Sequence, residues 1–276
     1  MTVLQTPDQI LPASRDIRVP GLAKDISRYR LRLAQNHQDL LAALRLRYRV
    51  FSLELNEGPE SAHERGYETD EFDEVCDHLL VEHVSSGAAV GTYRLQTGQM
   101  AARNRGYYSA REFDFSVYEG LRDSVLELGR ACIHRDHRSF QVLLLLWRGI
   151  AAYAQERKAR YLVGCSSLTS QSAKEGFDAY RQLQPYLVEA SLRTSPVKEF
   201  RLPIAGTESA PFLKLARLLR AYLSIGARIC GEPAIDRDFK TIDFLTLLDL
   251  EGLSPVARAR FLALPGKLGG KGGASS

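Results

Sequence analysis

Two ionisable residues interrupt the apolar run "VLELGRACI" at 125–133. The run predicts a buried strand, in which the charges of Glu127 and Arg130 are unfavourable unless each is paired or used. Residues three apart on a regular strand face opposite sides, so the two side chains meet only where the strand is bulged. One is expected to line a ligand cleft while the other fixes the site from behind. The alternative is a structural ion pair between Glu127 and Arg94.

Another set of charged residues precedes this run. Arg47 shares the apolar face of a predicted helix with Phe51, where it either belongs to a site or extends to solvent from the edge of the stripe. Asp70 and Asp73 belong to "TDEFDEVCD". That segment forms either a carboxylate pair that can bind an ammonium group or an acidic surface loop.

A basic turn, "HRDHRS" at 134–139, follows the strand and precedes a long apolar stretch. Ser139 is expected to cap the helix that this stretch predicts. The free N–H groups at a helix N-terminus attract phosphate, and Arg135 and Arg138 stand close enough in sequence to help hold one. Solvated surface charge is the alternative for either arginine.

Apolar periodicity predicts the elements that must position these residues. Strands are predicted at 28–34, 78–84, 88–96, 125–133, 160–165, 186–192 and 241–250, and helices after Asn36 and at 140–157, 170–183 and 211–229. A hairpin, then strand–helix–strand–helix, then a closing strand indicates an α/β fold with a mixed sheet and helices on both faces.

The domain organisation follows from composition. Residues 1–27 are aperiodic and are predicted to form a flexible arm, and the glycine-rich residues 263–276 a disordered tail. Between them, 28–262 is predicted to form one domain that includes the amphipathic helix 211–229 and the closing strand 241–250. The net charge of +4 is too weak to indicate a nucleic-acid partner.

The cysteines and the apolar runs indicate a cytoplasmic protein. Four cysteines lie far apart without a C-x-x-C pair, which predicts free thiols in a reducing compartment and no zinc site. The N-terminus lacks the pattern of a secretory signal. The richest apolar run, 142–147, is interrupted by Arg148 and is too short to cross a bilayer.

The order of these motifs resembles the acyl-homoserine-lactone synthases, acyltransferases with the GCN5-related N-acetyltransferase (GNAT) fold. That resemblance implies a mainly antiparallel central sheet with helices on both faces. The family tryptophan that follows the phenylalanine is missing from "SLELNEG", which weighs against S-adenosylmethionine as the substrate. The matching positions are Arg47 and Phe51 (R-x-x-x-F), Asp70 and Asp73 (D-x-x-D), Arg94 ("GTYRL"), and Glu127 and Arg130 ("ELGR").

A closer resemblance covers about 28–262. "DEFDEVCDHLLV", "ELGRACIHRDHR" and "LLRAYLSIGARICGEPAIDRDFKTIDFLTLLDL" are similar to the ornithine N-acyltransferase group, often labelled hemolysin-like. The resemblance implies transfer of a 3-hydroxyacyl chain from acyl carrier protein to the α-amine of ornithine, giving lyso-ornithine lipid, with no bound cofactor or metal. The phosphate loop of the fold usually contains glycines, whereas "RSFQVL" has none. Arg135, Arg138 and Ser139 are therefore expected to contact the phosphopantetheine.

The same resemblance implies roles for the charged residues. Glu127 is the candidate base that deprotonates the attacking amine. Asp70 and Asp73 are expected to hold cationic groups of the amino acid, and Arg94 or Arg130 its carboxylate. The basic residues Lys214, Arg217, Arg220 and Arg228 of the predicted helix 211–229 indicate docking of acyl carrier protein or an anionic membrane surface, or simple packing.

Other functions stay open at this point. The acceptor could be lysine, glycine or glutamine instead of ornithine, and a lactone synthase that uses S-adenosylmethionine is a second reading. A non-catalytic, membrane-active acyl-binding protein is a third reading, against which the missing secretion signal and the presence of Glu127 and Arg130 argue.

Overall fold

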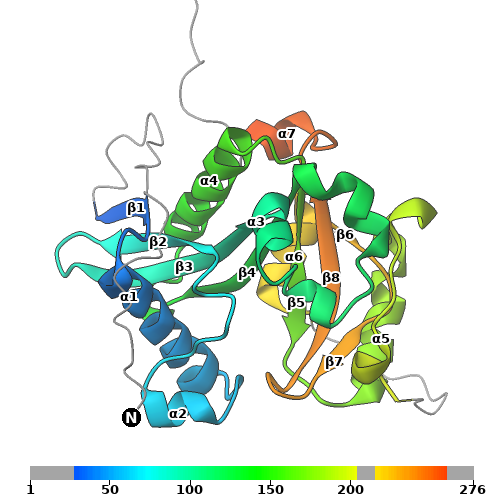
Figure 1. The fold of residues 1–276 in the computed structure, drawn as a ribbon, viewed down its shortest axis with the longest axis horizontal. Helices are drawn as coiled ribbons and strands as arrows, with labels where there is room; N and C mark the ends of the chain where they lie inside the picture. Colours follow the sequence, from blue (N-terminus) through cyan, green and yellow to red (C-terminus); the bar gives the residue numbers. More distant parts are fainter. Residues whose placement is uncertain (1–27, 204–214, 260–276) are drawn as a thin grey trace, which may run out of the picture.

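An eight-stranded sheet organises the protein, in a computed structural model that describes residues 28–203 and 215–259 (Figure 1). The strand order is β1-β2-β3-β4-β5-β8-β6, and β7 also pairs with β8. Only β4 and β5 run parallel, so the sheet is mixed and mainly antiparallel, as predicted. The strands are β1 (Tyr29–Leu33), β2 (Asp77–His83), β3 (Ala88–Thr97), β4 (Val125–Ile133), β5 (Tyr161–Leu168), β6 (Arg228–Ile229), β7 (Ala234–Asp236) and β8 (Thr241–Asp249).

Helices cover both faces of the sheet, which confirms the predicted fold class (Figure 1). On one face Leu46 of α1 and Val50, in the π-helical segment Tyr48–Glu54 that continues α1, pack against Cys132 of β4. On the other face Val142 and Leu146 of α4 pack against the sheet. The helices are α1 (His37–Arg47), α2 (Ser61–Arg65), α3 (Gly98–Arg103), α4 (Phe140–Glu156), α5 (Ala173–Leu183), α6 (Arg217–Ser224) and α7 (Pro255–Ala257). None of the helices in the described ranges is long and apolar enough to cross a membrane.

Two predicted elements are wrong. The helix predicted at 211–229 is the shorter α6, because Gly226 adopts a φ of +105° after it and Arg228–Ile229 pair with β8 instead. Residues 211–214, with Lys214, lie outside the described part. The strand predicted at 186–192 is a pair of 3₁₀ turns joined by a short loop, in which Val188 donates a single ladder-like hydrogen bond to Ile229.

The pairing of β4 with its two neighbours shapes the site. β4 has nine residues and β5 eight, yet they pair only from Val125 to Glu127, and beyond that point the strands diverge. On its other side, the register with β3 shifts between Thr92 and Arg94. Arg130 lies opposite this shift with a φ of +50°, so β4 is bulged there. The bulge is the condition under which Glu127 and Arg130 were expected to share one site.

Candidate active site

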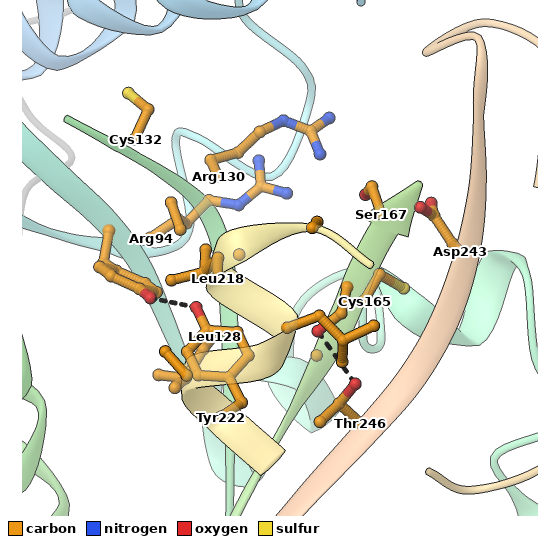
Figure 2. Close-up of a pocket in the computed structure, with 18 of the residues that line it drawn as sticks. Arg94, Leu128, Arg130, Cys132, Cys165, Ser167, Leu218, Tyr222, Asp243 and Thr246 are labelled. Carbon is orange, nitrogen blue, oxygen red and sulfur yellow. Dashed lines mark hydrogen bonds between the residues drawn. The ribbon is translucent and has the colours of Figure 1, made fainter. Parts of the chain in front are cut away.

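The divergence of β4 and β5 leaves a cavity of about 710 Å³ whose lining comes from both faces of the sheet. On the α1 face the lining is polar and includes Arg94, Gln96, Glu127 and Arg130. On the α4 face it is apolar. Figure 2 shows Arg94 and Arg130 in one part of the cavity and Tyr222 of α6 in another. The cavity therefore joins a charged compartment to an apolar one through the gap between two strands.

The apolar compartment lies between α4 and α6. The hydroxyl groups of Tyr93 and Tyr222 are hydrogen-bonded, and the rings of Trp147 and Tyr222 lie 5.4 Å apart in an edge-to-face arrangement. Leu143 and Leu248 complete this part of the lining. An alkyl chain would be shielded from water here, since the α6 face toward the sheet is apolar.

Six charged residues, of which Asp70 and Arg130 are partly exposed and the others buried, form what we call the ion-pair network: Arg47, Arg94, Arg130, Glu68, Asp70 and Asp73. Arg47 is fully buried, and its guanidinium donates to Asp73 at 2.6 and 3.0 Å and to Glu68. Asp73 also accepts the backbone N–H of Asp70 at 2.9 Å. Three positive and three negative groups compensate one another, which is the condition for stable burial.

The network extends to the cavity through two arginines. Arg94 donates to Asp70 at 2.5 Å and to Asp73 at 3.0 Å, while its Nη2 is buried without a hydrogen-bond partner. Arg130 donates to Asp70 at 2.7 Å and to Glu68 at 3.2 Å. Its guanidinium lies between the rings of Tyr108 and Phe239, at 4.5 and 4.1 Å from their centroids. Two oriented guanidinium groups therefore face the polar compartment.

Three of the alternative readings from the sequence are wrong. Arg47 does not extend to solvent, because two buried carboxylates compensate its charge. The segment around Asp73 is no exposed acidic loop, since Asp73 is buried and the arginines hold its pKa well below the usual range. Arg94 forms no ion pair with Glu127, because the bulge and the acidic segment bring it to Asp70 and Asp73 instead.

Glu127 is the third residue of β4 and the last one that pairs with β5. It is buried, and its carboxylate accepts the backbone N–H groups of Tyr108 at 2.9 Å and Ser109 at 2.7 Å. Burial raises its pKa, and these two hydrogen bonds oppose the increase. The cavity wall thus contains a carboxylate whose orientation is fixed by two backbone hydrogen bonds and whose pKa is raised by burial.

The N-terminus of α4 borders the same cavity. Ser139 caps the helix by accepting the N–H of Val142 at 3.4 Å, and both Ser139 and Arg138 line the cavity. Arg138 forms a bidentate pair with Glu54 at 2.5 and 2.8 Å. The side chain of Arg135 is 73% exposed, next to Asp136, and does not line the cavity. Two of the three residues expected at a phosphate therefore lie together, and the third points away.

Two parts of the site escaped the sequence analysis. One is Glu68, the third carboxylate of the ion-pair network. Charge balance would have indicated it only if Glu127 had been set aside as a base, because the three arginines would then have faced Asp70 and Asp73 alone. The other is the ring of Phe239, which stacks on Arg130. Its centroid lies 6.1 Å from that of the Phe51 ring, and both rings line the cavity.

Sequence reasoning also missed a group of four buried acids, which we call the acidic cluster: Glu57, Glu112, Asp236 and Asp243. The signal was available, because Asp243 interrupts the apolar run "TIDFLTLLDL" just as Glu127 interrupts its own run. Glu57, Asp236 and Asp243 line the cavity, and donor atoms of Glu112, Cys165 and Asp243 lie within 4.8 Å of one another. That spacing can hold a metal ion, which would have to displace the proton of the Cys165 thiol, whose pKa burial raises.

Comparison with known proteins agrees with this geometry. A family model for an acetyltransferase (GNAT) domain matches residues 46–148. An L-ornithine N(alpha)-acyltransferase of Rhodobacter capsulatus is 31% identical over 243 residues, 82% of this chain and 92% of that protein. One of Agrobacterium fabrum is 32% identical over 249 residues, 85% of each chain.

Among solved structures, the acyl-homoserine-lactone synthase LasI has a TM-score of 0.48 at 12% identity, over 84% of this chain and 94% of that chain. FeeM, an N-acyl amino acid synthase from uncultured soil microbes, has a TM-score of 0.46 at 12% identity, over 85% and 96%. From its sequence relatives and the matched domain, the chain belongs to the L-ornithine N(alpha)-acyltransferase family and is an acyltransferase with a GNAT-like fold.

Proposed function

We propose that this protein transfers a 3-hydroxyacyl chain from acyl carrier protein to the α-amine of L-ornithine, the first step of ornithine-lipid synthesis. The observation that carries the proposal is the cavity, in which an oriented acid and two guanidinium groups adjoin an apolar compartment. The names of the sequence relatives support ornithine as the acceptor. A charged amino acid and an alkyl chain would meet at the gap between β4 and β5.

Glu127 acts as the base in this proposal. It accepts a proton from the α-ammonium of the acceptor, directly or through a water, and its raised pKa suits that role near neutral pH. The free amine attacks the thioester carbonyl, the C–S bond breaks, and the leaving thiolate takes up a proton. Backbone N–H groups that β4 no longer shares with β5 would stabilise the oxyanion of the tetrahedral intermediate.

The ion-pair network orients the acceptor. The unpartnered Nη2 of Arg94 and the stacked guanidinium of Arg130 would bind its carboxylate. Asp70 and Asp73 already accept hydrogen bonds from the arginines of the network, so they contribute by fixing these guanidinium groups. Arg47 and Phe51 support the same wall, Arg47 by holding Asp73 and Phe51 by contact with Phe239.

The donor would approach from the N-terminus of α4. Ser139, Arg138 and the free N–H groups of the helix would hold the phosphate of the pantetheine arm, with Arg135 nearer the surface. Arg217, Arg220 and Arg228 are exposed beside the apolar compartment. Their charge suits an acidic carrier protein, and also contact with an anionic membrane surface that would receive the lyso-lipid product.

A mass-spectrometric assay tests the proposal. The purified protein is given 3-hydroxyacyl carrier protein or the matching acyl-CoA, with ornithine, lysine, glycine, glutamine and S-adenosylmethionine. We expect Nα-acylornithine from the carrier-protein donor. A lactone product, acylation of another amino acid, or transfer from acyl-CoA alone would each refute the corresponding part of the proposal.

The role of Glu127 has its own test. We expect Glu127→Gln to lower turnover at saturating ornithine by roughly 10²–10⁴, because the amide cannot accept the proton. Glu74→Gln, at an exposed position, is the matched control and should leave the rate unchanged. If Glu127→Gln kept full turnover, Glu127 would be only the anchor of Tyr108 and Ser109.

A further inference from the structure

The acidic cluster has no function in the mechanism above, although three of its four members, Glu57, Asp236 and Asp243, line the same cavity. Asp243 is 4% exposed, and its Oδ1 has no hydrogen-bond partner. Oε1 of Glu112 is equally buried and equally without a partner. An acceptor atom buried in this way is unfavourable unless a ligand supplies the missing donor.

Within the described part of the chain, the cluster also lacks a compensating cation, and burial together with Asp243 and Asp236 raises the pKa of Glu112 well above its usual range. Among residues 28–203 and 215–259, no lysine, arginine or histidine forms an ion pair with its four carboxyl groups. The guanidinium that most influences Glu112 is that of Arg130, which Glu68 and Asp70 already engage. Glu57 instead accepts from the hydroxyl of Thr169 at 2.5 Å, and Asp236 from the N–H of Phe239 at 2.8 Å.

Two of the unpartnered atoms of the cavity lining belong to side chains of opposite charge, Arg94 and Asp243. Figure 2 shows the guanidinium of Arg94 and the carboxylate of Asp243 extending into the cavity from opposite sides. At the first, Nη2 lacks an acceptor, and at the second, Oδ1 lacks a donor. A ligand that satisfies both carries a carboxylate at one end and a hydrogen-bond-donating cation at the other.

We propose that the acidic cluster binds the side-chain ammonium of a diamino acid acceptor and so selects dibasic over neutral amino acids. This inference rests on the proposed function, in which the same cavity binds the acceptor for Nα-acylation. An ammonium group carries three N–H donors and can satisfy Asp243, Glu112 and a third oxygen of the cluster together. An ammonium is favoured over a metal ion because one diamino acid can satisfy Oδ1 of Asp243 with its cation and Nη2 of Arg94 with its carboxylate, whereas a metal ion would leave Nη2 without an acceptor.

The test compares two acceptors that differ only in the group concerned. L-Norleucine carries a methyl group where L-ornithine carries its side-chain ammonium. We expect the unmodified enzyme to favour ornithine by roughly 30-fold or more in kcat/KM, the effect of leaving a buried charge unpaired. Asp243→Asn should remove most of this preference through a higher KM for ornithine, with little change for norleucine. Glu112→Gln should act in the same direction.

A matched control and a metal measurement complete the experiment. Asp249→Asn lies on the same strand but pairs with Arg160 outside the cavity, and it should keep the preference. Equal rates for both acceptors in the unmodified enzyme, or equal losses for both in Asp243→Asn, would overturn the inference while leaving Nα-acylation intact. Stoichiometric metal in the purified enzyme, lost in Asp243→Asn, would overturn it in favour of a metal site. An unmodified enzyme that acylates no amino acid would refute the proposed function itself.

Discussion

Two groups of buried charges lie on the same face of the sheet and differ in their balance. In the ion-pair network, three guanidinium groups and three carboxylates compensate one another, and the pKa of Asp73 is lowered well below its usual range. In the acidic cluster, four carboxyl groups lie together without a cation, and burial raises the pKa of Asp243 to about 6. Burial raises the pKa in both groups, but in the network the neighbouring arginines outweigh it, so the pKa values of Asp73 and Asp243 shift in opposite directions.

The difference shows which charges serve the fold and which await a ligand. In the ion-pair network, the interactions between the guanidinium and carboxylate groups offset the loss of their hydration. These interactions depend on exact geometry, so the network holds its side chains in fixed positions. A buried carboxylate without a counter-charge lowers the stability of the fold until a cationic ligand binds. In the inference above, the acidic cluster therefore lowers the stability of the free protein and favours ligand binding. The following predictions separate these two roles.

The largest effect is expected from breaking the ion-pair network. Arg47→Met leaves Glu68 and Asp73 as buried carboxylates that have lost their partner, which should lower the free energy of unfolding by about 3–5 kcal/mol. Urea denaturation followed by circular dichroism measures this change. Arg45→Met, at an exposed position of the same helix, is the control and should change it little. A loss below about 1 kcal/mol would show that Arg47 is not essential to the network.

A smaller effect concerns the binding of ornithine as the pH falls. The pKa of Asp243 is raised to about 6, so the group is charged above that pH and neutral below it. Glu57, Glu112, Asp236 and Cys165 face the same group. We expect the Kd for ornithine, measured by calorimetry, to increase on the order of tenfold from pH 7 to pH 5. A similar increase in Asp243→Asn would assign the pH dependence to another group.

The contribution of the acidic cluster to the free energy of unfolding should depend on pH in the opposite sense to that of the ion-pair network. A raised carboxyl pKa means that the folded state binds the proton more tightly, so the charged form destabilises the protein as pH rises through about 6. Asp243→Asn should therefore raise the free energy of unfolding by on the order of 1 kcal/mol at pH 8, and by much less at pH 4. Loss of stability at pH 8 would mean that Asp243 has a structural partner.

The smallest effect is expected where the two groups of charges meet. Phe239 stacks on Arg130 of the network, and its backbone N–H binds Asp236 of the cluster. Phe239→Leu keeps the backbone contact but removes the cation–π contact, which should weaken acceptor binding by about 0.5–1 kcal/mol. The KM for ornithine should increase a few-fold without a change in turnover. A large fall in turnover instead would indicate that the ring also positions the reacting groups.

Much of the fold was open to prediction because the relevant signals are local. The apolar run around Glu127, the cap at Ser139 and the closing strand all depend on residues within a few positions of one another. The helix after Ser139 and the candidate site residues Arg47, Asp73 and Arg94 were recognisable in the same way. The limits of α6 were not, because Arg228 and Ile229 join the sheet only when β8 is beside them.

The sequence alone determined which charged side chains are buried in strands, since a charged residue within an apolar run predicts a buried charge. It did not determine their partners. Arg47 meets Asp73 across 26 residues, and Asp243 lies beside Glu112 only because β8 follows β5 in the sheet. Strand order and the gap between β4 and β5 are set by packing over the whole domain, so tertiary structure alone decided which charges were compensated and which were left for a substrate.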